Sequence, residues 1–442
     1  MTSDDIRAKI TPPMSPARVQ TIARDLDLRA LPADFLANPY PVYALLQKHE
    51  PIKRMPDGSY FLTRHADVVA VYRDAQTFSA DKKVEFGPKY NNPPYNAAPY
   101  ALPGHDAPLF EHHTNSLVFN DPPLHTRVRK LIMGALTRRA IDDLAPGLVT
   151  LVDQLLDQVH TQGGGDLIED FASAIPVEII GNLLGIPHTD RSPLRGWSLA
   201  ILGALEPRLT PVQEALGHRS VRDFYTYLQG LVAERRKQPG DPERDVLTRL
   251  IQGENGEQLS EIELLQNCQF LLNAGHETTT NLIGNALICL QENPSEQAQL
   301  LQRMAQASDE ASHAAVLNLA VDEFLRFESS NQLGNRRALQ ASQVGGVQLP
   351  AGALVTLCIG AANRDPAQFA NPEQLKLQRT DGKHLAFGFG IHQCAGLSLA
   401  RLEGRIAIGR FLQRFPGYQL THTPVRGGRA RFRGFLNAAF SV

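Results

Sequence analysis

The chain of 442 residues lacks three features, and each absence argues against a class of protein. No apolar run approaches the ~20 residues of a membrane-spanning helix. The N-terminus carries Asp4 and Asp5 and lacks the basic and then apolar profile of a secretory signal. A formal net charge of −2 gives no electrostatic reason to expect nucleic acid or an anionic membrane as a partner. We therefore expect a cytoplasmic protein without a membrane anchor.

Cysteine is also scarce, with four residues that lie far apart in the sequence. Their spacing does not match a zinc site, and a reducing compartment makes disulfides unexpected. Cys268, Cys289 and Cys358 lie inside apolar runs and are predicted to be small buried hydrophobic residues. Cys394 lies in a glycine-rich segment instead, so its presence needs a chemical explanation.

The pattern of the chain predicts a mainly α protein with a small β lobe. Residues 1–30 are polar and rich in proline, and we expect a loosely held lead-in. Residues 84–118 show no sustained periodicity, and a loop of this length is usually functional or mobile. Length alone suggests about two or three domains, but no linker is visible, so we expect one domain over residues 1–442. Short strands are predicted within 51–63 and 344–358, and helices at about 123–138, 141–160, 168–184, 212–236, 259–292, 295–306 and 314–328.

The stretch Phe387–Gly396 is a glycine-punctuated loop that brings Cys394 to the start of a helix beginning near Gly396. Gly388 and Gly390 permit backbone conformations that other residues avoid. The positive end of the helix favours the thiolate, and a bound ferric iron would deprotonate the thiol outright. A thiolate on haem iron promotes cleavage of the O–O bond of dioxygen. The alternative is a structural cysteine after a turn, which this ten-residue pattern disfavours.

A second motif, Ala274-Gly275-His276-Glu277-Thr278-Thr279, lies in the middle of the apolar helix 259–292. The glycine and the threonine hydroxyls favour a local opening of this helix that would make room for dioxygen. Cleavage of the O–O bond needs protons, which the carboxylate of Glu277 beside the hydroxyl of Thr278 can deliver. A solvated stripe on a surface helix is the alternative, and the apolar flanks argue against it.

Together the two motifs resemble the cysteine loop and the oxygen-activation motif of cytochromes P450, and the likeness extends from about Asn38 to the C-terminus. The resemblance implies a bacterial, soluble, ferredoxin-dependent P450, with haem b between the long central helix and the cysteine-loop helix. Cys394 would bind the iron, and Glu277 and Thr278 would be catalytic. Further implied haem contacts are His125, Arg129, Ala274, Arg336, Phe387, Gly388, His392 and Gly396, of which His125, Arg129, Arg336 and His392 would hold the propionates.

The pair Glu323 and Arg326 is three residues apart and can join on one helix face. It resembles the Glu-x-x-Arg pair of the same family, which implies a structural tie between this helix and a later loop.

Substrate contacts are predicted mainly on the long helix. Phe270 and Asn273 lie seven and four residues before Glu277, so they share its face. Phe270 is expected to be an apolar wall. We hypothesise that Asn273 bonds a polar group of the substrate, with an internal bond to its own helix as the open alternative. Leu333 matches a pocket wall of the family. The three histidines at 105, 112 and 113 lack metal-ligand companions and are expected to be solvated or to line the pocket.

The expected reaction is hydroxylation of a small, mostly apolar molecule by a monooxygenase. The segment after Cys394 is too short for a reductase domain, so electrons are expected from an iron–sulfur ferredoxin and its NAD(P)H-dependent reductase. Basic residues in 127–139 and 401–410 would offer docking faces to an acidic ferredoxin, and the enzyme is expected to be a monomer. A peroxide-driven peroxygenase and a catalytically silent haem sensor or carrier are alternatives, which the intact Glu277–Thr278 relay disfavours.

Overall fold

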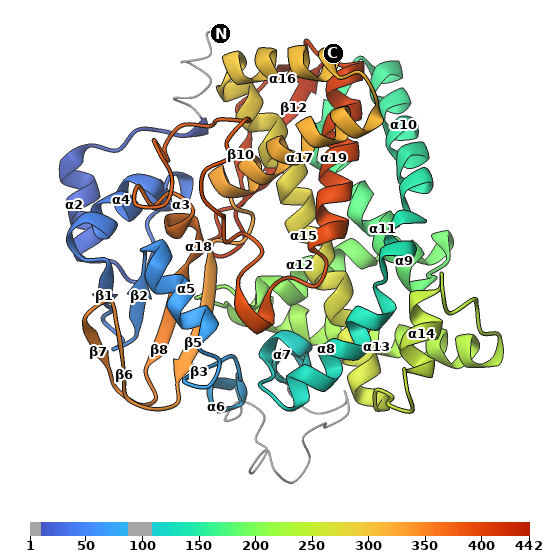
Figure 1. Ribbon diagram of the computed structural model, residues 1–442, viewed down its shortest axis with the longest axis horizontal. Coiled ribbons are helices and arrows are strands. Elements are labelled where there is room, and N and C mark those ends of the chain that lie inside the picture. The colour runs from blue at the N-terminus through green and yellow to red at the C-terminus, as the bar shows by residue number, and fades with distance from the viewer. Residues whose placement is uncertain (1–9, 87–107) are drawn as a thin grey trace. The chain divides into compact units, whose positions relative to one another are not determined.

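The structure is a computed structural model that describes residues 10–86 and 108–442 (Figure 1). Its contacts cluster into two compact units. Unit 1 comprises the chain up to Phe78, residues 148–175 and residues 278–442, and unit 2 comprises residues 79–147 and 176–277. Whether the chain forms the expected single domain stays a prediction. Within the described ranges, no helix combines the length and apolar character that a membrane span requires.

The main sheet of unit 1 joins strands from distant parts of the sequence. β1 and β2 form an antiparallel hairpin, and β2 runs parallel to β8. Figure 1 shows the blue β1 and β2 beside the orange β8 and β5. The predicted strands in 51–63 and 344–358 are confirmed. The sheet order is β1 (Ile52–Arg54), β2 (Tyr60–Leu62), β8 (Leu354–Cys358), β5 (Leu333–Ala338) and β3 (Phe78–Ser79).

Smaller sheets complete the β structure of the described residues. A hairpin of β6 (Ser342–Val344) and β7 (Val347–Leu349) lies just before β8 in the sequence. The remaining strands are β4 (Gly164–Asp166), β12 (Ala439–Ser441) and β9 (Gln419–Leu420) in one sheet, and β10 (Val425–Arg426) with β11 (Phe435–Asn437) in another.

The expectation of a loosely held lead-in over residues 1–30 is wrong for Pro16–Arg24, which form helix α2. Ser15 caps this helix by accepting a hydrogen bond from the amide of Arg18, and Pro16 suits its first turn. Val19 and Ile22 are buried in one apolar cluster with residues of α3 (Ala33–Ala37), α4 (Tyr40–His49) and β2. Apolar residues three or four positions apart share one face of a helix, and this face of α2 is buried.

The other helices of unit 1 lie before and after the cysteine loop in the sequence. They are α5 (His65–Arg73), α10 (Ala145–Gln162, its first residues in unit 2), α16 (Pro294–Gln306), α17 (Glu310–Phe327), α18 (Ile359–Ala362) and α19 (Leu397–Arg414). A π-helical turn, Leu167–Ala172, begins the stretch predicted as a helix over 168–184.

Unit 2 is helical, and several of its helices were not predicted, among them α7 (Pro108–Asn115) and α12 (Leu194–Gly203). α7 lies in the segment expected to be a loop, whose residues 87–107 lie outside the described part. α12 places Trp197 on Phe224, with ring centres 5.1 Å apart, so Trp197 is a packing residue. The others are α6 (Lys83–Phe86), α8 (Leu124–Ala135), α9 (Arg138–Asp142), α11 (Ala174–Leu184), α13 (Pro211–Lys237) and α14 (Val246–Gln252).

The long helix α15 (Glu261–Glu292) runs without a break through Gly275, so the expected local opening is not present. The glycine serves packing instead. A Cβ at Gly275 would lie 2.8 Å from Cδ1 of Ile180 in α11, closer than side chains approach one another. The boundary between the two units falls inside α15, after Glu277.

Candidate active site

The loop that precedes α19 has a backbone conformation that favours glycine at two positions. Gly388 and Gly390 have φ values of +66° and +71°, in the left-handed region. A Cβ at Gly390 would lie 2.4 Å from the carbonyl oxygen of Tyr72, the penultimate residue of α5. The loop therefore packs its short helical turn, Gly390–His392, against the end of α5.

This loop fixes Cys394 at the start of α19, as predicted. The amide of Cys394 donates a hydrogen bond to the carbonyl oxygen of Phe387, 2.9 Å away. Gly396 is the N-cap residue of α19, so Cys394 lies two residues before the positive end of the helix. The thiol is thereby placed where a thiolate is favoured.

Exposure separates Cys394 from the other three cysteines. Cys268, Cys289 and Cys358 are 0–3% exposed, as predicted, whereas Cys394 is partly exposed. Burial raises the pKa of Cys268 and of Cys358 to about 12, so these two stay protonated and unreactive. Cys394 is the cysteine that an external group can reach.

One stripe of α15 is partly exposed, while most of the other residues in this part of the helix are buried. Phe270, Ala274 and Thr278 are spaced four residues apart and are each partly exposed, with Leu271 and Gly275 beside them. Residues four apart share one face of a helix. The stripe therefore borders open space along the middle of α15, and it contains a predicted substrate residue, a predicted haem contact and a predicted catalytic residue.

The acid of the motif is buried next to this stripe. Glu277 is 5% exposed, which excludes the solvated surface stripe considered as an alternative. Burial, together with the charge of Arg195, lowers the pKa of the neighbouring His276 to about 3. His276 is therefore neutral at physiological pH, and Glu277 is the acidic side chain of the motif.

His112 and His113 are buried, at 1% and 2% exposed, so they are not solvated. The other expectation, that they line the pocket, stays a prediction. Nδ1 of His112 lies 2.6 Å from Oε1 of Gln266, and the amide nitrogen of Asn273 lies 3.3 Å from its Nε2. His112 thus bridges two residues of α15 seven positions apart. His105 lies outside the described residues.

The hydrogen bonds define which nitrogen of His112 carries the proton. The hydroxyl of Ser116 donates to the carbonyl oxygen of His112 at 2.8 Å, so toward Nδ1, 3.4 Å away, it can only accept. Nδ1 is therefore the protonated nitrogen, and Nε2 accepts from Asn273. The side-chain nitrogen of Asn273 is thus bonded to His112 of α7 and not to its own helix. Its contact with substrate stays a prediction.

Leu333 does not border an open space. Its side chain is 2% exposed and packs in the apolar cluster that contains Phe61 and Cys358. The prediction of Leu333 as a pocket wall is wrong because the strand β5 turns this side chain into the core under the sheet.

The residues predicted to hold the haem propionates occur in two pairs, one in each unit. His125 and Arg129 lie one turn apart on α8, with His125 buried and Arg129 partly exposed. Arg336 on β5 has its guanidinium carbon 5.0 Å from the ring centre of Tyr72, and His392 belongs to the turn before Cys394. Their roles stay predictions.

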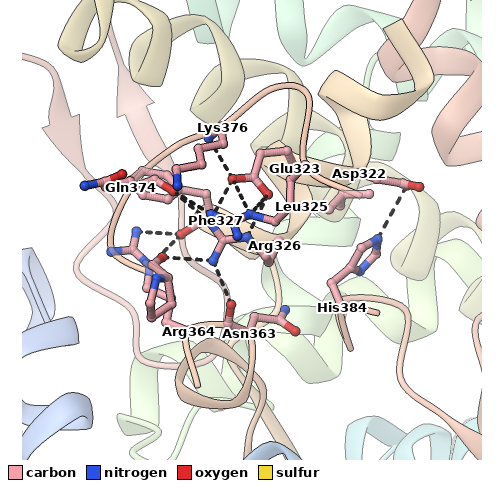
Figure 2. A network of polar contacts seen from close by, with 12 residues as sticks. Asp322, Glu323, Leu325, Arg326, Phe327, Asn363, Arg364, Gln374, Lys376 and His384 are labelled. Carbon is pink, nitrogen blue, oxygen red and sulfur yellow. Dashed lines mark hydrogen bonds and ion pairs between the residues drawn. The ribbon is translucent and has the colours of Figure 1, made fainter. Parts of the chain in front are cut away.

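The pair Glu323 and Arg326 is confirmed as an internal tie (Figure 2). Nε of Arg326 donates to Oε2 of Glu323 at 2.7 Å, and both side chains are buried. The other guanidinium nitrogens donate to backbone carbonyls of a later segment, and Arg379 of that segment also pairs with Glu323. The carbonyl oxygens belong to Asn363, Pro372 and Gln374.

The expected basic docking faces are largely neutralised by acids distant in the sequence. Arg127 pairs with Glu263, and Lys130 with Glu257 at 3.0 Å. On α19, Arg401 pairs with Asp322 and Arg410 with Asp153. Arg139 and Arg405 make no ion pair with any described residue.

Comparisons with known proteins identify the family of the chain. The family model of cytochrome P450 matches residues 204–422. Cytochrome P450 107B1 of Saccharopolyspora erythraea is 39% identical over 324 residues, covering 73% of this chain and 74% of that protein. Cytochrome P450 monooxygenase PikC of Streptomyces venezuelae is 34% identical over 406 residues, covering 90% of this chain and 89% of its own.

Among solved structures, P450BioI in complex with an acyl carrier protein ligated to hexadec-9Z-enoic acid superposes with a TM-score of 0.82. It is 30% identical, and the alignment covers 93% of this chain and 100% of that chain. The protein therefore belongs to the cytochrome P450 family and has its fold. It is a haem monooxygenase with haem b as cofactor, and it uses a substrate, dioxygen and a redox partner.

Proposed function

We propose that Cys394 is the thiolate ligand of the haem iron in a ferredoxin-dependent enzyme that hydroxylates small, mostly apolar molecules. The observation that carries this assignment is the position of Cys394. It is the one accessible cysteine of the chain, and it follows a loop with two left-handed glycines and precedes the N-terminus of α19.

The residues of the loop fit a flat macrocycle. A Cβ at Gly396 would meet nothing within 4 Å, and one at Gly388 would meet only the carbonyl oxygen of His392, at 3.8 Å. Open space thus borders the glycines next to Cys394. Bound haem would supply an iron that activates dioxygen. The chain would hold it through Cys394, the propionate partners His125, Arg129, Arg336 and His392, and contacts from Ala274, Phe387, Gly388 and Gly396.

Glu277 and Thr278 would handle protons. The carboxyl of Glu277 is buried beside the neutral His276, and the hydroxyl of Thr278 lies on the accessible stripe of α15. A proton passed from Glu277 reaches that open space through Oγ1 of Thr278, because a hydroxyl both accepts and donates. The stripe also supplies the substrate wall, since Phe270 and Ala274 offer apolar surface there.

Electrons would come from a separate acidic ferredoxin that docks near the cysteine loop of unit 1. Arg73 is exposed and lies over the ring of Phe389, with its guanidinium carbon 5.5 Å from the ring centre. Arg405 lies one turn after Arg401 on α19 and is not used in an ion pair among the described residues. These charges would attract an acidic partner by long-range electrostatics.

Two measurements test the proposal. The reduced carbon monoxide complex should show the red-shifted Soret band of thiolate ligation, and Cys394→Ser should abolish it. Product should form with NAD(P)H and a ferredoxin system but not with peroxide alone. A band unaffected by Cys394→Ser would contradict the ligand assignment, and turnover by peroxide alone would favour a peroxygenase.

The proton relay has its own test. Thr278→Ala should lower the product formed per NAD(P)H consumed, by at least tenfold if the hydroxyl acts in proton transfer. Thr226→Ala provides a control, because Thr226 bonds the carbonyl of Arg222 on an exposed face of α13. Equal ratios in the two variants would contradict the relay.

A further inference from the structure

Asp322 lies directly before Glu323 on α17, and its carboxylate contacts a different segment. Nε of Arg401, on α19, donates to Oδ1 of Asp322 at 2.8 Å. Nε2 of His384 lies 3.4 Å from the same oxygen, a contact seen at the right of Figure 2. Nδ1 of His384 accepts from the amide of Ala386 at 3.2 Å, so the proton of the neutral ring is on Nε2 and points to Asp322.

Both partners of Asp322 touch one aromatic ring of the cysteine loop. The guanidinium carbon of Arg401 lies 4.8 Å from the ring centre of Phe387, within the range of a cation–π contact. The rings of His384 and Phe387 have centres 5.6 Å apart. The carbonyl of this same Phe387 accepts the amide hydrogen of Cys394. The contacts thus run from Asp322 through two side chains to Phe387 and from its backbone to Cys394.

Asp322 stays charged in this setting. Its partial burial opposes ionisation, but hydrogen bonds from His384 and Arg401 hold the pKa of the carboxyl below its ordinary value. The side chains of Arg401 and Asp322 are 31% and 39% exposed, and pairs of such exposure contribute little to stability. A large effect of this pair would therefore come from what it positions.

We propose that Asp322 is a positioning residue for the Cys394 thiolate: with Arg401 and His384 it fixes Phe387, whose carbonyl holds the amide of Cys394. The inference rests on the proposed function, since it takes Cys394 as the iron ligand. Partners that orient a ligand are worth about ten- to a hundredfold in metal affinity or activity. α17 thus presents two successive acids, Glu323 to the segment at 363–379 and Asp322 to the two residues that contact Phe387 of the cysteine loop.

The experiment uses the holoenzyme with Asp322→Ala, Arg401→Gln and the double variant. Asp153→Ala is the matched control, because Asp153 also accepts from an arginine of α19, Arg410, at 2.6 Å and with similar exposure, 38% and 42%. The readouts are the reduction potential and the rate at which the carbon monoxide complex loses its thiolate band on mild warming. Asp322→Glu tests rescue by a longer carboxylate.

Asp322→Ala and Arg401→Gln should each lose the band about tenfold faster than the wild type. They should shift the potential in the same direction, and the double variant should be no worse than the worse single variant. Asp153→Ala should match the wild type, and Asp322→Glu should recover most of the loss.

The alternative is an effect of charge alone. Removal of an anion and removal of a cation would then shift the potential in opposite directions, with the band equally durable in all variants, and this outcome would overturn the inference. Variants indistinguishable from Asp153→Ala would overturn it too. A wild-type protein without the band would instead overturn the assignment of Cys394, and the inference with it.

Discussion

The side-chain amide of Asn273 donates a hydrogen bond to Nε2 of His112, 3.3 Å away, and this contact joins α15 to α7 one turn before Glu277. The same ring donates from Nδ1 to Gln266, two turns earlier on α15. α7 is also packed against α13, where a Cβ at Gly217 would lie 2.7 Å from Leu109. His112 therefore provides polar contacts between α7 and α15, whereas apolar contacts hold α7 against α13.

Replacement of His112 by phenylalanine should destabilise the protein. Phenylalanine keeps the volume of the ring, but Oε1 of Gln266 and the side-chain nitrogen of Asn273 lose their hydrogen-bond partner and remain buried. Each unsatisfied group costs about 1–3 kcal/mol, so the free energy of unfolding should fall on the order of 2 to 6 kcal/mol. Denaturant unfolding of the holoenzyme measures this. His313→Phe, at a partly exposed histidine bonded to Gln413, is the control and should change stability little.

The stability of the protein should also decrease as the pH is lowered, because of His112. Burial lowers the pKa of His112 to about 4 in the folded state, against about 6.5 in the unfolded chain. Between these pH values the unfolded chain binds a proton that the folded protein does not. The contribution is therefore complete above about pH 6.5 and is lost as the pH falls toward 4. The stability difference between wild type and His112→Phe should shrink over this interval, and a constant difference would contradict the assigned pKa.

The long periodic segments could be predicted from the sequence to within a few residues. Helix 259–292 is observed as Glu261–Glu292, and 212–236 as Pro211–Lys237, because their apolar residues recur over many turns. The glycine loop before Cys394 was also predictable, since left-handed residues and a helix start leave a local signature. Resemblance to a family supplied the roles of these residues.

The features that could not be predicted depend on contacts between segments that are distant in the sequence. α7 is eight residues long, too short to show a period, and it is buried by α13 and α15. The acids that neutralise Arg127 and Arg401 lie 136 and 79 residues away, so no local pattern reveals them. Asn273 and Gly275 were assigned by position on the helix, but their partners, His112 and Ile180, come from other elements.

Alanine at Gly390 should damage the thiolate site much more than alanine at Gly388. Both residues have a positive φ, which costs a residue with a side chain about 1–2 kcal/mol. Only Gly390 faces a wall, since its Cβ would lie 2.4 Å from the carbonyl oxygen of Tyr72, whereas Gly388 has no neighbour closer than 3.8 Å. Gly390→Ala should thus lose most of the thiolate band, and Gly388→Ala should keep it with a modest loss of stability. Equal damage would show that φ, and not contact with α5, sets the requirement for glycine.

Glutamine at Glu403 should stabilise the protein at alkaline pH. Glu403 lies on α19, is 2% exposed, and its Oε2 has no hydrogen-bond partner among residues 10–86 and 108–442. Burial raises the pKa of this carboxyl to about 8, against about 4.3 in the unfolded chain. Between these values the folded protein keeps a proton that the unfolded chain releases, so stability falls as the pH rises toward 8.

Glu403→Gln has no proton to lose, and its midpoint of thermal unfolding should exceed that of the wild type by several degrees at pH 8, with little difference near pH 4. Glu310→Gln, in the exposed first turn of α17, is the matched control and should not show this growing difference. If the gap between Glu403→Gln and wild type were the same at both pH values, the carboxyl would have to be ionised in the folded protein. It would then need a cationic partner, and no described residue supplies one.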